Sequence, residues 1–217
     1  MQNMPEGPEI HRAAQRLRNA LEGSTITHVE CPYPTIQGQE HRFLGNQVIS
    51  IEARSKAMLI HIGEDVLYSH NQLYGRWTIQ KNSTKPKKTN RSLRIKLQNE
   101  THTACLWSAT DIQIIEPWEI EGHPYIAKLG PDVANRNVQF DDVLEQVQNP
   151  KFSRRQLSHL LLDQAFLAGV GNYLRSEILH SARISPSRKL SSLSSTEQHN
   201  LAHSAIDITQ LAFDQQG

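Results

Sequence analysis

Residues 164–174 read QAFLAGVGNYL, and this stretch decides how the C-terminal part of the chain is organised. Two helical patterns meet here through Gly169 and Gly171, an arrangement that any helical hairpin can use. Glycines let a backbone come close, and amides that open a helix, together with Asn172, can bind a phosphate group. Arg175, one turn later, would add a positive charge. The stretch therefore predicts a helical hairpin whose second helix begins at a phosphate site.

The sequence on both sides of this turn repeats apolar residues at helical spacing. The repeats cover residues 140–147, 157–161, 173–178 and 197–213. The C-terminal part of the chain is therefore predicted to be all helical.

The N-terminal part follows a different pattern. Residues 8–22 have helical spacing, but from residue 24 to about 116 the apolar residues form short alternating runs separated by turn residues. Such a series predicts a sandwich or barrel. Prolines and glycines then punctuate the chain before the helices begin. The fold class is α+β, with a helix-flanked β-sandwich in residues 1–117, a hinge in 118–136 and a helical domain in 137–217.

Composition excludes several classes of protein. The chain has 217 residues, of which 37% are hydrophobic and 21% charged, so disorder, collagen and coiled coil fit poorly. No apolar run approaches the ~20 residues of a membrane helix, and residues 1–10 lack the apolar core of a signal peptide. We therefore expect a cytoplasmic protein with no membrane partner. The lone pair Cys31 and Cys105 and the 11 scattered histidines show no zinc-ligand spacing.

Basic residues gather in two runs although the net charge is only +1. One such run alone is typical of a solvated face. An acidic segment, residues 116–145, separates the first run from the second, which spans residues 151–189. Because both basic runs adjoin unusual motifs, they favour a groove that binds phosphates. The first run consists of Lys81, Lys85, Lys87, Lys88, Arg91, Arg94 and Lys96.

Residues 4–9, MPEGPE, precede the first predicted helix. Helix capping alone explains them, because Pro and Glu are both favoured in a first turn. Their chemical interpretation needs Pro5 at the N-terminus, where its nitrogen is a nucleophilic secondary amine rather than an amide. A free α-amino group titrates near ~7.7–8.0, so a fraction is unprotonated at neutral pH. Glu6 would then donate and accept protons, and translation from Met4 with removal of that methionine would expose the amine.

Two further segments lie in the predicted sandwich. Lys56 stands at a strand entrance, where a lysine usually guards a sheet edge. Residues 70–75, HNQLYG, are typical of a hairpin loop whose Leu and Tyr pack on the sandwich. Their functional interpretation is a wedge that enters a duplex and fills the gap left by an extruded nucleotide.

Five segments together carry a resemblance to a known family. MPEGPEI, RSKAML, YSHNQLYG, LGPDV and LLDQAFLAGVGNYLRSEIL resemble, in family order, the formamidopyrimidine-DNA glycosylase family, and within it the endonuclease VIII branch. The resemblance implies a β-sandwich, a hinge and a helix–two-turns–helix domain. It also implies a base excision repair enzyme that acts on double-stranded DNA with oxidised pyrimidines or abasic sites. Because one flipped nucleotide does not require a dimer, we expect a monomer.

The resemblance further implies roles for single residues. Pro5 would attack the deoxyribose C1′ and form a Schiff base, Glu6 would be the general acid and base, and Glu9 a further active-site carboxylate. Lys56 would be a third catalytic residue, which contacts the phosphate that flanks the lesion. Asn172 would bind a phosphate, and Gln72, Leu73 and Tyr74 would fill the void that an extruded nucleotide leaves.

The resemblance implies a zinc finger in the full-length protein, and we expect the natural chain to continue past Gly217 and to hold zinc there. Two other hypotheses stay open at this point. One is a catalytically silent protein that binds damaged or abasic DNA, and the other is a generic nucleic-acid or protein scaffold.

Overall fold

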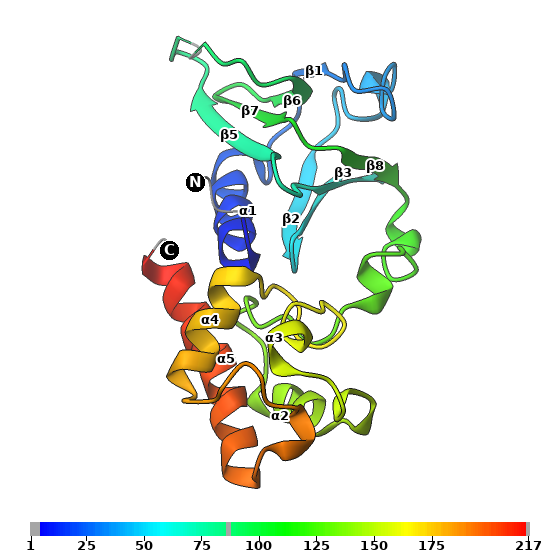
Figure 1. Cartoon of the computed structure of the whole chain (residues 1–217). Coiled ribbons are helices and arrows are strands. Elements are labelled where there is room, and N and C mark those ends of the chain that lie inside the picture. The colour runs from blue at the N-terminus through cyan, green and yellow to red at the C-terminus, as the bar shows by residue number, and fades with distance from the viewer. Residues whose placement is uncertain (1–4, 86–87, 216–217) are drawn as a thin grey trace. The chain divides into compact units, whose positions relative to one another are not determined.

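The computed structural model describes residues 5–85 and 88–215 (Figure 1). Met4, Lys87 and Gly217, on which the sequence interpretation drew, lie outside the described residues. The described chain forms two compact units. The first contains Pro5 and residues 12–123, and the second contains residues 6–11 and 124–215. The boundary at residue 123 falls inside the segment expected to be a hinge, and hinge motion there stays a prediction.

The first unit consists of two four-stranded antiparallel sheets, as the alternating runs predicted. Apolar side chains of both sheets are buried. One sheet has the order β1 (His28–Glu30), β6 (Leu93–Gln98), β7 (His102–Trp107), β5 (Arg76–Lys81). The other has the order β2 (Val48–Arg54), β3 (Ala57–Ile62), β4 (Asp65–His70), β8 (Asp111–Ile115). Single turns of 3-10 helix lie at η1 (Glu40–Arg42) and η2 (Pro117–Glu119).

Helix α1 (Gly7–Leu21) belongs to both units. Its first five residues are counted with the second unit, and the remainder with the first. In the first unit Leu17 and Leu21 are buried, and the Arg18 guanidinium donates to the Ile51 carbonyl oxygen at 2.7 Å. These contacts attach the greater part of α1 to the β-sheets.

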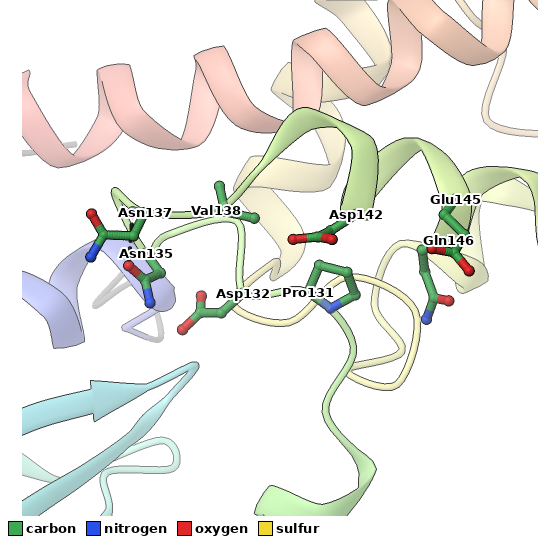
Figure 2. A pocket seen from close by; sticks show the side chains of 8 residues that line it. All are labelled: Pro131, Asp132, Asn135, Asn137, Val138, Asp142, Glu145 and Gln146. Atoms are coloured by element: carbon green, nitrogen blue, oxygen red, sulfur yellow. Dashed lines mark hydrogen bonds between the residues drawn. The ribbon is translucent and has the colours of Figure 1, made fainter.

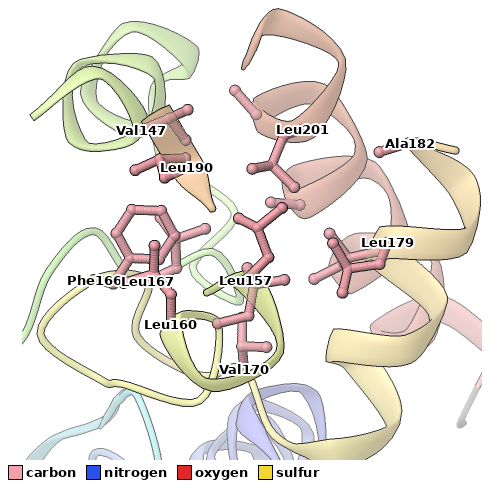
Figure 3. Close-up of a cluster of buried hydrophobic side chains, with 14 of the residues drawn as sticks. Val147, Leu157, Leu160, Phe166, Leu167, Val170, Leu179, Ala182, Leu190 and Leu201 are labelled. Atoms are coloured by element: carbon pink, nitrogen blue, oxygen red, sulfur yellow. The ribbon is translucent and has the colours of Figure 1, made fainter. Parts of the chain in front are cut away.

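The second unit is helical, as predicted. It contains α2 (Phe140–Gln148), α3 (Leu157–Leu160), α4 (Asn172–Ser181) and α5 (Ser195–Gln215), with 3-10 turns η3 (Ile126–Lys128), η4 (Pro150–Phe152) and η5 (Leu190–Ser192). Leu157, Leu160, Phe166 and Val170 converge in a buried apolar cluster between these helices (Figure 3). None of the described helices is long and apolar enough to span a lipid bilayer.

Candidate active site

The Glu6 carboxylate lies against the first turn of α4. Glu6 is 3% exposed, and its Oε2 accepts hydrogen bonds from the Gly171 amide at 2.7 Å and the Leu174 amide at 3.3 Å. Its Oε1 accepts from the Tyr173 amide at 3.0 Å. The first amides of a helix have no partner within the helix, and the helix dipole favours negative charge at this end. The arrangement therefore stabilises the ionised carboxylate of Glu6.

Gly171 makes room for this carboxylate. A Cβ at position 171 would lie 2.6 Å from Cγ of Glu6, and its three nearest neighbours would all be atoms of the Glu6 side chain. The backbone of the same turn also binds the chain beside Glu6, since the Gly7 amide donates to the Gly169 carbonyl oxygen at 2.8 Å. Gly169 has a φ of +92°, a conformation that side-chain-bearing residues rarely adopt. Both glycines of the motif are thus used for close approach, as the sequence predicted.

The expectation that these amides bind a phosphate is wrong for the amides of Gly171, Tyr173 and Leu174. They bind an anion, but that anion is the chain's own Glu6 carboxylate. Asn172 lies among them with an exposed side chain, and its contact with DNA stays a prediction.

Arg175 is half-buried, and its Nη1 donates to the Ser158 carbonyl oxygen at 3.3 Å. It lines a pocket of about 790 Å³ with His180, Arg183 and Ser185. None of the residues that line this pocket is acidic. The surroundings of Arg175 are thus compatible with a phosphate contact, and that contact stays a prediction.

Glu9 lies in the first turn of α1 and binds two groups. Its Oε2 accepts a hydrogen bond from the Glu6 amide at 2.8 Å, the contact of a capping-box glutamate with the residue that precedes a helix. The Tyr173 hydroxyl group donates to the Glu9 carboxylate, at 3.2 Å from Oε1 and 3.3 Å from Oε2. Sequence reasoning missed Tyr173, whose only signal was a hydrogen-bonding aromatic residue directly after Asn172.

A third contact anchors the same segment. Nε2 of His11 lies 2.9 Å from Oδ2 of Asp132, and the other oxygen of Asp132 accepts from the Ala134 amide at 3.0 Å. Asp132 also lines a pocket of about 520 Å³ together with Asp142 and Glu145 (Figure 2). Three carboxylates make this pocket unsuitable for a DNA phosphate.

In the first unit, Lys56 occupies the turn between β2 and β3, so the expected strand entrance is present. The first residue of β3 pairs with His70 at the end of β4. Burial lowers the pKa of His70, and the positive charge of Lys56 lowers it further, against an opposing effect of Asp111. His70 is therefore a neutral neighbour of Lys56. The sequence interpretation included His70 in the segment 70–75 but gave it no role of its own.

The loop after β4 has an exposed tip, and hydrogen bonds with its neighbours hold its backbone. Leu73 is 57% and Tyr74 67% exposed, so the interpretation in which both pack on the sandwich is wrong. The Gln72 amide donates to Nδ1 of His70 at 3.1 Å, and Nη1 of Arg91 donates to the Tyr74 carbonyl oxygen at 2.5 Å. An exposed apolar tip on a held backbone is the form that a wedge requires.

Part of the first basic run has structural contacts. Nζ of Lys96 lies 2.8 Å from the carboxylate of Glu30, and this hydrogen bond lowers the pKa of Glu30. The guanidinium of Arg94 donates to the Ala109 carbonyl oxygen at 2.7 Å and lies over the ring of Tyr33. The described residues of the run that are exposed are Lys81, Lys85 and Lys88. The positive surface is thus smaller than the sequence predicted.

Each unit therefore gathers part of the predicted site. The second unit brings Glu6, Glu9, Asn172 and Arg175 to α4 and its neighbours, and the first brings Lys56 and the loop residues Gln72, Leu73 and Tyr74 to the ends of β3 and β4. Pro5 directly precedes Glu6 and is half-buried.

Comparison with known proteins gives two family matches and close relatives. Residues 4–107 match the formamidopyrimidine-DNA glycosylase N-terminal domain, and residues 129–217 match the formamidopyrimidine-DNA glycosylase H2TH domain. Proteins named Endonuclease 8 from Escherichia coli strains 536 and S88 are each 42% identical over 215 residues, which is 99% of this chain and 81% of theirs.

Two solved structures share the fold. A complex of Lactococcus lactis Fpg with abasic-site DNA has a TM-score of 0.81 and 22% identity, over 98% of this chain and 79% of that one. MutM in complex with DNA that contains carbocyclic 8-oxo-G has a TM-score of 0.81 and 22% identity, over 98% of this chain and 82% of that one.

Proposed function

Because this chain belongs to the formamidopyrimidine-DNA glycosylase family, we propose that it excises oxidised pyrimidines from double-stranded DNA with Pro5 as the nucleophile. Its activity is that of a bifunctional DNA glycosylase and lyase for abasic sites. One observation supports the assignment of residues most strongly. The Glu6 carboxylate, next to Pro5 in the chain, is buried and held by three amides at the start of α4.

The proposed reaction begins with the amine of Pro5. Its lone pair attacks C1′, the bond from C1′ to the base breaks with its electron pair going to the base, and the departing base takes a proton from solvent. The new ammonium loses its proton, O4′ gains one and the sugar ring opens, which leaves an iminium between C1′ and the Pro5 nitrogen. Removal of a proton from C2′ then expels the 3′ phosphate, and water hydrolyses the iminium to return the amine.

Glu6 is suited to the proton transfers of this sequence. Three amides hold its carboxylate, which in the ionised form can accept the proton that the attacking amine loses. It can then give that proton to O4′ as the ring opens. Because the carboxylate is fixed by backbone groups, little reorganisation accompanies these transfers.

The DNA contacts are distributed over both units. We assign Lys56 and Asn172 to backbone phosphates, with Arg175 in support, since a lysine in a turn, an exposed amide and a guanidinium group all bind phosphate. We assign the exposed tip of residues 72–74 to the space that an extruded nucleotide leaves, because an apolar wedge stabilises an unstacked step. His70, held neutral beside Lys56, is a further candidate contact.

Zinc is not assigned to the described residues. Within residues 5–85 and 88–215, no three or more His, Cys, Asp or Glu side chains lie where they could hold a metal ion together. No step of the proposed reaction passes through a metal.

We place the reaction in the bacterial cytoplasm, at the nucleoid. The protein would act as a monomer, since one flipped nucleotide needs one copy of the protein.

The test compares two forms of the protein. One is translated from Met4 and has lost that methionine, so that intact mass shows Pro5 as the first residue, and the other retains Met1 to Asn3. Both are mixed with a duplex that carries one oxidised pyrimidine, and borohydride is added to reduce the iminium to a stable amine. We expect a covalent protein–DNA adduct from the form that begins at Pro5 and none from the longer form, in which the Pro5 nitrogen is an amide.

Two results would overturn the proposal. One is strand cleavage by the longer form at the rate of the shorter one, which would exclude Pro5 as the nucleophile. The other is the absence of any adduct from the form that begins at Pro5. If that form then binds abasic DNA as tightly as its Pro5→Gly variant, the protein is a silent binder.

A further inference from the structure

Tyr173 is bonded to both carboxylates of the segment that follows Pro5. Its backbone amide donates to Glu6 at 3.0 Å, and its hydroxyl group donates to Glu9 at 3.2 and 3.3 Å. A single residue in the first turn of α4 therefore holds the two acidic side chains that lie nearest to Pro5 in the sequence.

Glu9 in turn determines the orientation of one peptide group. Its Oε2 accepts the hydrogen bond of the Glu6 amide at 2.8 Å, and that amide belongs to the peptide bond between Pro5 and Glu6. A peptide group is planar, so a fixed N–H direction also fixes the carbonyl group and Cα of Pro5. One rotatable bond, from Cα to the carbonyl carbon of Pro5, then separates this plane from the ring that carries the nucleophile.

We propose that Tyr173 is a positioning residue for the nucleophile: it orients Glu9, and Glu9 orients the peptide group that carries Pro5. This inference rests on the proposed function of Pro5. Helix capping alone does not require a phenol, because Glu9 already makes the hydrogen bond of a capping-box glutamate with the Glu6 amide. A long carboxylate side chain held by one hydrogen bond retains much of its rotational freedom. The Tyr173 hydroxyl, carried by a half-buried ring, removes that freedom.

Tyr173→Phe removes the hydroxyl group and keeps the ring and the backbone amide that binds Glu6. Misplacement of a reacting group by about 1 Å can cost 10²-fold in rate. We expect the single-turnover rate of adduct formation at saturating protein to fall about 10- to 100-fold, with an unchanged dissociation constant for a duplex that contains a stable abasic analogue. Tyr125→Phe removes a hydroxyl elsewhere in the second unit and is expected to leave both values unchanged.

A second pair of variants separates positioning from folding. Tyr173→Gln supplies a side-chain hydrogen-bond donor. Leu is similar in size to Gln but has no donor, so Tyr173→Leu is the matched control. Gln and Leu are both good helix formers. We expect Gln to restore several-fold more rate than Leu at equal helical circular dichroism. In a Glu9→Ala background, where the proposed intermediary is missing, Tyr173→Phe is expected to cause no further loss.

The outcomes separate this inference from the function on which it rests. If the unsubstituted protein that begins at Pro5 gives no adduct, the proposed function fails. If it gives an adduct and Tyr173→Phe forms it at the same rate, Tyr173 has no positioning role. The inference would also be overturned if Tyr173→Gln and Tyr173→Leu lowered the rate of adduct formation equally. A further 10- to 100-fold fall in rate when Tyr173→Phe is added to Glu9→Ala would overturn it as well.

Discussion

Because Gly171 packs closely against Glu6, we expect the effect of Gly171→Ala on stability to depend strongly on whether the Glu6 side chain is present. In Gly171→Ala the added methyl group lies 2.6 Å from Cγ of Glu6, so the carboxylate has to move away from the amides of α4. Overpacking costs about 1–3 kcal/mol, and one lost hydrogen bond to a charged group about 1.5–3 kcal/mol. We therefore expect Gly171→Ala to lower the free energy of unfolding of the second unit by about 3–5 kcal/mol.

The same substitution is expected to be nearly neutral once Glu6 is shortened. In Glu6→Ala the three atoms nearest to the added methyl group are absent, and Ala in place of Gly before a helix costs about 0.5 kcal/mol. The two substitutions should thus show a coupling energy of about 2.5–4.5 kcal/mol, far above the ~0.5 kcal/mol scatter of independent sites.

Urea denaturation of the four proteins measures this coupling. Circular dichroism at 222 nm reports mainly on the second unit, which holds all the described α-helices except the greater part of α1. Fluorescence follows the first unit, because Trp77, Trp107 and Trp118 all belong to it. The fluorescence transition serves as an internal control and is expected to shift little. Equal destabilisation by Gly171→Ala in both backgrounds would refute the argument that Gly171 is required by the Glu6 carboxylate.

Three further predictions follow from the described contacts. Arg183 follows α4 with a φ of +56°, so Arg183→Gly is expected to raise the urea midpoint of the circular dichroism transition, by about 0.5–1 kcal/mol of stability. Burial lowers the pKa of His70, so the unfolded chain binds more protons than the folded one below about pH 6.5. Stability of the first unit should therefore fall between pH 7 and pH 5, and fall less in His70→Asn, as measured by fluorescence-detected urea titrations. Burial raises the pKa of the Cys31 thiol to about 12, so iodoacetamide at pH 8 should modify Cys31 rapidly only after denaturant is added, which mass spectrometry can follow.

The sequence was most informative where function and local structure coincide. Gly169 and Gly171 predicted that a backbone comes close at this turn, and the hydrogen bond between Gly7 and Gly169 confirms it. The catalytic role of Glu6 beside Pro5 stays a prediction. The sequence could not show which residue each side chain of the site contacts in the folded protein. Tyr173 and Glu9 are 164 residues apart, and His11 and Asp132 are 121 residues apart, so no local pattern connects them.

The sequence predictions that proved wrong have physical reasons of the same kind. A helix N-terminus does attract an anion, but the rule does not say whether the anion is a ligand or a side chain of the same protein, and here Glu6 takes the amides. Strand β4 departs from the alternation that the sequence predicted between residue 24 and about residue 116. In β4 four consecutive residues are buried, so the alternation that indicates a half-exposed strand is absent.

Residues 6–11 complete a unit whose other residues begin at position 124, and this has a consequence for biosynthesis. A ribosome makes these six residues before the rest of their unit, and the amides that receive Glu6 are made only when residue 174 is reached. At bacterial elongation rates of about 5–20 residues per second, this interval is on the order of ten to thirty seconds. The β-sheets can fold during this delay, whereas the nascent chain carries its N-terminal segment without its final partners. A polypeptide released early would therefore contain Pro5 and Glu6 without the helix that orders them.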